Sequence, residues 1–293
     1  MIKMVPYFDP QTNKYPYPEY TDKHYLSVKK DNGEVFDENY RYIDKRWYVR
    51  FLNTLVYCVV FIVVFPLTRI RMGLRIRGKQ NLKKHKALIK KGVISCCNHV
   101  HMWDYLCIMN AIKPKRPRIL VWDKNIRGEN GGLIRNVGGI PIPTESLKGT
   151  IKCFQTIKDY LNGGGWLHIY PEGSMWEYYA PIRPLKKGAA YFAIEYNKPI
   201  IPLAFSYRKP GWFRSKVLHQ IATFTLNIGE PIFPNRELDR KAMEIDLTKR
   251  VHDAMVKLAG RDVKHKLYPE IFDNSKRVDY YTTNYGVGYK GSY

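Results

Sequence analysis

From residue 74 onward, short apolar runs along this chain alternate with stretches of helical periodicity. Seven apolar runs predict strands, at 74–77, 93–97, 118–122, 140–142, 166–170, 200–207 and 223–228. Apolar residues at three- and four-residue steps predict helices from Leu147 to Leu161 and from Leu247 to Leu258, each followed by glycine. Strands that alternate with helices are typical of an α/β protein, and we expect a mixed central sheet flanked by helices.

A longer apolar run precedes these strands, at 51–67. It contains 17 residues and no charged side chain, and a helix that spans a membrane needs about 17 to 25. Basic residues flank both ends, so the positive-inside rule gives no orientation. This pattern favours a helix or helical hairpin that enters one leaflet and returns, with its cations on anionic headgroups. The alternative is a buried core helix.

These patterns divide the chain into four parts. Residues 1–45 form a polar N-terminal extension without the apolar segment of a secretory signal. We expect a membrane-associated helical segment at 46–72 and the α/β domain at 73–272. Residues 273–293 lack apolar periodicity and predict a loose C-terminal tail.

Composition narrows the choice of partners. The 293 residues include 49 Lys and Arg against 26 Asp and Glu, a net charge of +23, which attracts nucleic acid, anionic lipid headgroups or phosphate-bearing substrates. An odd number of cysteines without CxxC spacing indicates buried thiols in a reducing, cytosolic setting. Cys96 and Cys97 lie close to two histidines, but neighbouring strand residues point to opposite faces, so we expect no metal site.

Polar residues follow the predicted strand at 93–97 directly. They are Asn98, His99, His101 and Asp104, and ligands bind at such strand ends in open α/β sheets. His99 and Asp104 are about 140° apart on a regular helix, so they meet only if the chain turns between them. The carboxylate would then hold the imidazole in one tautomer, and the other ring nitrogen would accept a proton from a hydroxyl. The alternative is two unrelated polar residues in a loop.

A second polar segment follows the predicted strand at 166–170. Pro171-Glu172-Gly173-Ser174 indicates a sharp turn that presents a carboxylate and backbone N–H groups at the same sheet edge. Gly138 to Ile142 (GGIPI) lies between the two sites, and Pro199 to Leu203 (PIIPL) follows them. Together with GLRIRGKQNL at 73–82, this order of motifs resembles the glycerolipid acyltransferase family typified by 1-acylglycerol-3-phosphate acyltransferases. The resemblance covers about residues 73–207.

The resemblance implies roles for individual residues. His99 would be the general base that deprotonates the acceptor hydroxyl, Asp104 would orient it, and the oxygen would attack an acyl thioester directly. The loop at Glu172, Gly173 and Ser174 would bind the glycerol-phosphate acceptor. Pro202 and Ile140 would belong to an apolar wall near the acyl chain. No cofactor or metal is implied, because acyl-CoA or acyl carrier protein (acyl-ACP) serves as co-substrate.

The sequence departs from the family pattern at two arginines. Thr144 stands where family members usually carry an arginine, and Ser174-Met175 replaces the usual Thr-Arg. Either other cations bind the acceptor phosphate or the acceptor carries no phosphomonoester there. The candidate cations are Arg183, Lys186, Lys187, Lys124 and Arg135. We favour the first three, since they precede a predicted helix at 188–196, whose N-terminus suits an anion. Lysine binds phosphate as a point charge and does not reproduce an arginine fork.

We therefore expect a membrane-bound O-acyltransferase of phospholipid biosynthesis at the cytoplasmic face of the cell membrane. It would transfer a fatty acyl group from acyl-ACP or acyl-CoA to the free hydroxyl of lysophosphatidic acid. The expected partners are an anionic membrane surface, the acidic acyl donor and a lysophospholipid, without nucleic acid. One alternative keeps the chemistry but uses another lysolipid, an amino-lipid or a glycan hydroxyl. A second is a non-catalytic basic protein that binds membranes or nucleic acid.

Overall fold

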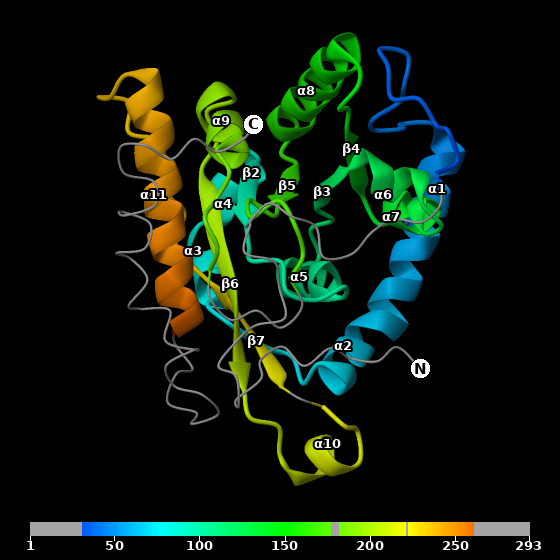
Figure 1. Cartoon of the computed structure of the whole chain (residues 1–293), viewed down its shortest axis with the longest axis vertical. Helices are drawn as coiled ribbons and strands as arrows, with labels where there is room; N and C mark the ends of the chain where they lie inside the picture. The colour runs from blue at the N-terminus through cyan, green and yellow to red at the C-terminus, as the bar shows by residue number, and fades with distance from the viewer. Residues whose placement is uncertain (1–30, 177–181, 221, 261–293) are drawn as a thin grey trace.

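A seven-stranded sheet forms the centre of the computed structural model, which describes residues 31–176, 182–220 and 222–260 (Figure 1). The strands are β1 Arg75–Arg77, β2 Val93–Cys96, β3 Arg118–Trp122, β4 Gly139–Ile142, β5 Trp166–Ile169, β6 Ile200–Arg208 and β7 Thr223–Ile228. Their order is β1-β7-β6-β2-β5-β3-β4, and every neighbouring pair is parallel except β6 and β7. The expected mixed sheet is confirmed, and each predicted strand is present with its ends within one residue.

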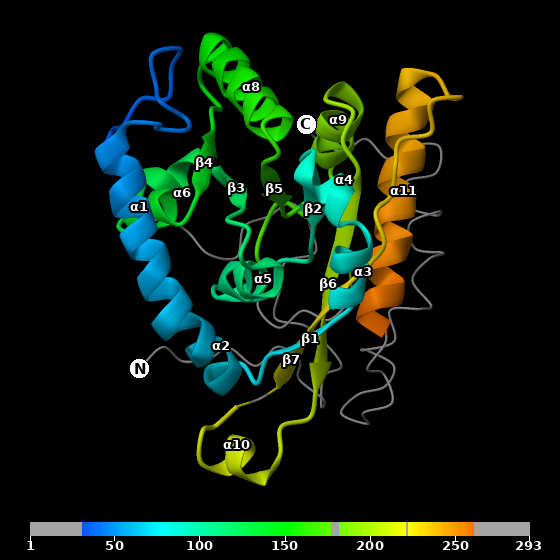
Figure 2. The same cartoon turned by 180° about the vertical axis from the view of Figure 1, so that it is seen from behind.

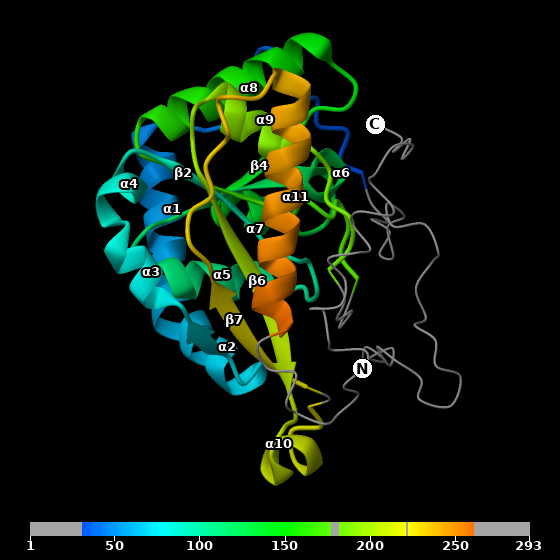
Figure 3. The ribbon, with the colours of Figure 1, turned by 90° about the vertical axis from the view of Figure 1, so that its left-hand side faces the viewer.

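Helices cover both faces of the sheet (Figure 3). They are α1 Trp47–Val59, the π-helical turn η1 Val60–Val64, α2 Phe65–Arg71, α3 Lys79–Lys84, α4 Lys86–Lys90, α5 Asp104–Ile112, α6 Asp123–Arg127, α7 Gly131–Asn136, α8 Leu147–Asn162, α9 Gly188–Glu195, α10 Trp212–Lys216 and α11 Arg240–Ala259. The two predicted apolar stripes lie in α8 and in α11. Ser146 and Asp239 cap these two helices by accepting hydrogen bonds from the backbone N–H groups of Gly149 and Ala242.

The strands are apolar along their whole length because both of their faces are buried. Consecutive side chains at the end of β2 point to opposite faces of the sheet. Cys96 packs in the cluster that contains α8, α9 and α11, whereas Cys97 packs in the cluster that contains α5. The two thiols therefore lie on opposite faces of the sheet, as expected from strand geometry.

The apolar segment forms one continuous helix from α1 through η1 to α2 along one side of the domain (Figure 2). Val60 and Phe65 pack on α5 and β3, and Asn110 of α5 donates hydrogen bonds to the Phe65 carbonyl at 3.2 Å and to Thr68 Oγ1 at 3.1 Å. The rest of its surface exposes large apolar side chains, namely Phe51, Leu52, Leu55, Val59, Phe61, Ile62, Val63, Leu67 and Ile70. By length and composition, Trp47–Arg71 could cross a membrane.

Part of the expected N-terminal extension belongs to the domain. Phe36 and Tyr42 are buried in the core cluster under α8, and Tyr40 stacks edge-to-face on both rings. These aromatic residues attach an otherwise polar stretch to the core. Residues 1–30, residues 261–272 of the expected domain and the expected tail at 273–293 lie outside the described residues.

Candidate active site

The two polar segments lie at one edge of the sheet, because β2 and β5 are adjacent and parallel. His99 follows β2 and Glu172 follows β5. Asn98 fixes the first loop to β6: its Oδ1 accepts a hydrogen bond from the Phe205 N–H at 2.8 Å. The chain then turns, and α5 begins at Asp104.

This turn brings His99 and Asp104 together. Asp104 Oδ2 lies 2.7 Å from His99 Nδ1 and also accepts from the backbone N–H groups of Val100 at 3.0 Å and His101 at 3.3 Å. Burial raises the pKa of Asp104, but the charge and hydrogen bond of His99, with hydrogen bonds from Tyr170 and Val100, hold it below its usual value. The ionised carboxylate can only accept, so Nδ1 carries the proton and Nε2 of the neutral ring is a base.

Tyr170 completes the support of the imidazole. Its hydroxyl donates to Asp104 Oδ1, and its ring stacks on the His99 ring with centroids 3.9 Å apart and planes 8° apart. The tyrosine therefore fixes both the carboxylate and the plane of the histidine. Sequence reasoning gave Tyr170 no role. The only signal was its position at the strand end, directly before Pro171.

Glu172 connects the two loops from a buried position. Its Oε2 accepts from the His99 N–H at 3.2 Å and pairs with Arg183 Nη2 at 2.9 Å, and its Oε1 accepts from the Arg183 N–H at 2.9 Å. Arg183 Nη1 donates to Ser174 Oγ at 2.7 Å, and the guanidinium lies 4.4 Å from the Trp176 ring centroid. All three polar residues are at most 3% exposed. The geometry makes Arg183 a support of this loop, whereas the sequence favoured it as a phosphate ligand.

Lys186 is the candidate cation beside the loop. Gly173 has φ +80°, and a Cβ there would come within 2.8 Å of Lys186 Cε and 3.0 Å of Nζ. Glycine thus permits both the left-handed turn and the close approach of the ammonium group. Lys186 is exposed and its N–H donates to the Pro171 carbonyl at 2.7 Å, while Lys187 is partly buried at the start of α9.

Thr144, which stands at the position of the first missing arginine, forms a hydrogen bond with a carboxylate. Thr144 follows β4 and donates to Oδ2 of the buried Asp123, which follows β3, at 2.8 Å. The same oxygen lies 3.5 Å from Arg127 Nη2. The other two candidate cations have partners of their own: Arg135 forms an ion pair with Glu34, and Lys124 lies 4.9 Å from the Trp122 ring centroid.

Pro202 and Ile140 are buried within strands. Pro202 of β6 pairs with Cys96, and Ile140 of β4 lies in the core cluster that contains α8. Their role as an acyl-chain wall stays a prediction. In the three described ranges, no group of three or more His, Cys, Asp or Glu side chains could hold a metal ion.

The fold and this site define an α/β domain with a histidine–carboxylate pair at a strand end. Residues 73–206 match the Acyltransferase family, and this match supports the acyltransferase class predicted from the motifs. The structure is similar to the crystal structure of the 1-acyl-sn-glycerophosphate (LPA) acyltransferase PlsC from Thermotoga maritima. The similarity has 16% identity and a TM-score of 0.43 and covers 70% of this chain and 88% of that chain. Comparison with curated proteins gives no match.

Proposed function

We propose that this protein is a membrane-bound O-acyltransferase that transfers a fatty acyl group from acyl-CoA or acyl-ACP to the free hydroxyl of lysophosphatidic acid. The observation that carries the proposal is the 2.7 Å contact between His99 Nδ1 and Asp104 Oδ2. It leaves Nε2 of a partly exposed ring as the available base. Among the described residues, no group is hydrogen-bonded to Nε2.

In the proposed mechanism, His99 Nε2 removes the proton from the acceptor hydroxyl while its oxygen bonds to the thioester carbonyl carbon. Breakdown of the tetrahedral intermediate breaks the carbon–sulfur bond, and the leaving sulfur takes the proton back from the imidazolium. Asp104 stabilises that imidazolium. Such a base contributes about 10² to 10⁴ in rate. The chemistry needs no metal and no cofactor beyond the acyl thioester.

Charge and surface support the choice of substrates. The net charge of +23 suits an acidic acyl donor and an anionic membrane surface, and the Lys186 ammonium beside Gly173 suits an acceptor phosphate. The exposed apolar face of α1 to α2 would attach the enzyme to the bilayer, at the cytoplasmic face in this proposal.

A second candidate is the same reaction on an acceptor without a phosphomonoester. It is favoured by Thr144, which is bonded to the Asp123 carboxylate where the family usually places an arginine. The Thr144 hydroxyl carries no positive charge with which to bind a phosphate, and it is already bonded to this carboxylate. Mass spectrometry of the products formed from a labelled acyl donor and a panel of lysolipids, amino-lipids and glycans separates the two acceptors.

We expect His99→Ala to lower turnover by at least about 100-fold and Asp104→Asn to cost nearly as much, because both remove the positioned base. His85→Ala is the matched control, since His85 also contacts a carboxylate, Glu230, but lies outside the site. Each of the three variants should remain folded and bind vesicles as the wild-type chain does. Retention of more than about a tenth of the turnover by His99→Ala contradicts the assignment of the base.

A further inference from the structure

The connection between β6 and β7 projects beyond the sheet and carries exposed apolar side chains. Residues 209–220, called the tip below, include α10 and extend away from the body of the molecule (Figures 1 and 2). Trp212 is 74% exposed, Phe213 58% and Val217 50%. Aromatic side chains at such exposure contribute little to the folded core, so their presence needs another explanation.

The tip is attached to the end of the apolar helix. Arg214 donates hydrogen bonds to the carbonyls of Ile70 at 2.6 Å and Arg69 at 3.1 Å. Gln220 donates to the carbonyls of Ile70 at 3.0 Å and Arg71 at 2.8 Å. These bonds satisfy carbonyls that the last turn of α2 leaves without a helical partner. The exposed apolar side chains of the tip therefore lie beside those of α2, which include Leu67 and Ile70.

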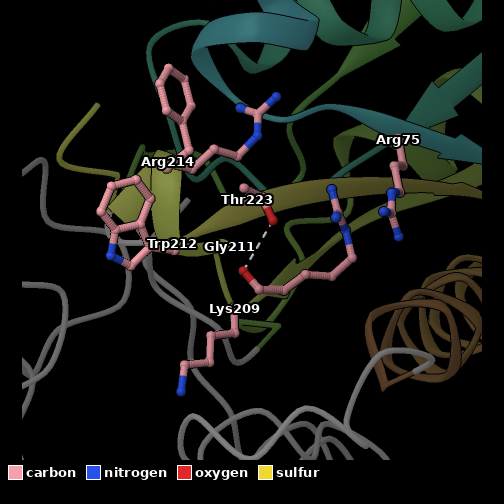
Figure 4. A pocket seen from close by; sticks show the side chains of 8 residues that line it. Arg75, Lys209, Gly211, Trp212, Arg214 and Thr223 are labelled. Atoms are coloured by element: carbon pink, nitrogen blue, oxygen red, sulfur yellow. Dashed lines mark hydrogen bonds between the residues drawn. The ribbon is translucent and has the colours of Figure 1, made fainter. Parts of the chain in front are cut away.

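The same surface is basic. Neither residues 45–103 nor residues 209–220 contain an Asp or Glu. A cavity of about 390 Å³ at the base of the tip is lined by Arg75, Lys209, Trp212 and Arg214, among others, and Trp212 and Lys209 extend outward from the strand ends (Figure 4). Arg75 and Lys209 are exposed, and no acidic side chain of the described ranges forms an ion pair with either.

The tip also lies on the catalytic side of the sheet. β6 is parallel to β2 and continues from Pro202, the partner of Cys96, to Arg208 before the tip begins, so the tip extends from the sheet in the direction of the edge that carries His99. A membrane bound at the tip would therefore face the edge that carries the histidine.

We propose that the tip is a second membrane-binding element, with an anionic phospholipid bilayer as its partner. Trp212 and Phe213 enter the bilayer at headgroup level, where amphipathic aromatic side chains are favoured, and Arg75, Lys209 and Lys216 contact lipid phosphates. A bilayer fits because the surface combines aromatic, aliphatic and basic groups without acids and continues the apolar face of α2. The inference rests on the membrane attachment proposed above.

The test is co-sedimentation of the full chain with vesicles of phosphatidylcholine and phosphatidylglycerol, and with vesicles of phosphatidylcholine alone. Trp212→Ser with Phe213→Ser should weaken binding by about tenfold or more, since two large apolar side chains lose their burial in lipid. The matched control is Leu147→Ser with Ile151→Ser, which removes two exposed apolar side chains from α8, at the opposite end of the molecule (Figure 1).

A second pair of variants tests the charge. Lys209→Glu with Lys216→Glu should weaken binding to the phosphatidylglycerol vesicles and leave binding to phosphatidylcholine almost unchanged. The control is Lys152→Glu with Lys158→Glu, the same change in net charge at exposed positions of α8. The tip variants should keep acyl transfer to a detergent-solubilised acceptor, because the tip does not contact His99.

The outcomes separate the two proposals. If the wild-type chain binds vesicles and the serine variant of the tip binds equally well, the tip is not a membrane element, and the attachment through α1 to α2 stands. If the wild-type chain binds neither vesicle, both the attachment and the role of the tip are wrong. Loss of activity on the detergent-solubilised acceptor would assign the tip to the catalytic machinery and overturn the proposal.

Discussion

Both oxygens of the Asp104 carboxylate are in use, Oδ2 by His99 and Oδ1 by Tyr170. Because the side chain is 1% exposed, water cannot replace either partner. His99 and Tyr170 both donate to this side chain, whereas the amide of an asparagine has one oxygen that accepts and one NH₂ group that donates. The NH₂ group would face one of the two donors, so one buried hydrogen bond could not form. This is the reason to expect Asp104→Asn to affect the base almost as strongly as removal of the histidine.

The two basic residues near Glu172 have different expected roles, and substitution separates them. Arg183→Leu leaves the Glu172 charge buried without its guanidinium, so the free energy of unfolding should fall by about 3–5 kcal/mol. Lys186→Ala removes an exposed side chain and should change stability by no more than about 0.5 kcal/mol. It should raise KM for lysophosphatidic acid by about tenfold, the effect of one lost charged hydrogen bond.

Urea unfolding and steady-state kinetics check both variants, with Lys187→Ala as a neighbouring lysine control. A stable Arg183→Leu enzyme with a raised KM would return Arg183 to the role of phosphate ligand that the sequence favoured. An unchanged KM for Lys186→Ala would remove Lys186 from the acceptor site.

At the scale of elements, the sequence predicted the strands and the long helices, because their apolar patterns can be recognised over a few neighbouring residues. Strands buried on both faces have apolar runs with abrupt ends, so their limits could be placed within one residue. Helices of five or six residues, such as α4, α6, α7 and α10, are too short to show a 3.6-residue repeat. The π-helical turn at Val60–Val64 has no sequence signal of its own.

Long-range pairing accounts for what could not be predicted in the site. His99 and Asp104 are close in sequence, and only a turn of the chain separates them, so their contact could be expected. The buried pair of Glu172 and Arg183 closes the loop that follows β5, and the bond of Thr144 to Asp123 joins the ends of β4 and β3. Spacing along the chain contains no information on which carboxylate meets which cation across such a loop.

The α1 to α2 helix should respond differently to changes on its two faces. Phe65 is 2% exposed and packs on α5 and β3, so Phe65→Ala should lower the free energy of unfolding by about 3–5 kcal/mol. Ile62 is 70% exposed, so Ile62→Ser should leave stability nearly unchanged and weaken vesicle binding. Denaturant unfolding and co-sedimentation measure the two effects.

Substitutions test this helix better than truncation. Deletion of residues 1–68 should release the protein from the membrane, but it would also remove packing from the domain, because it uncovers Met109 and the hydrogen-bonding groups of Asn110. The two effects could not be separated. Normal vesicle binding by Ile62→Ser combined with Phe51→Ser and Leu55→Ser would contradict attachment through the exposed face.

At the scale of the whole molecule, three buried histidines link stability to pH. Burial is the main cause that lowers the pKa of His168 to about 3 and those of His101 and His252 to about 4. In the unfolded chain each has the ordinary value of 6.5. The folded protein therefore holds these rings neutral, and between pH 6.5 and about 4 the unfolded state binds more protons.

Because the unfolded state binds more protons in this range, the free energy of unfolding falls as the pH drops from 6.5 toward 4. Above pH 6.5 the three histidines cause no such loss. Each histidine contributes a slope of about 1.4 kcal/mol per pH unit once its unfolded form is protonated. Denaturant unfolding at a series of pH values should show this decline. His168→Leu should make the slope shallower by about that amount, whatever its effect on stability at pH 7. An equal slope in that variant would mean that the ring of His168 is not held neutral by burial.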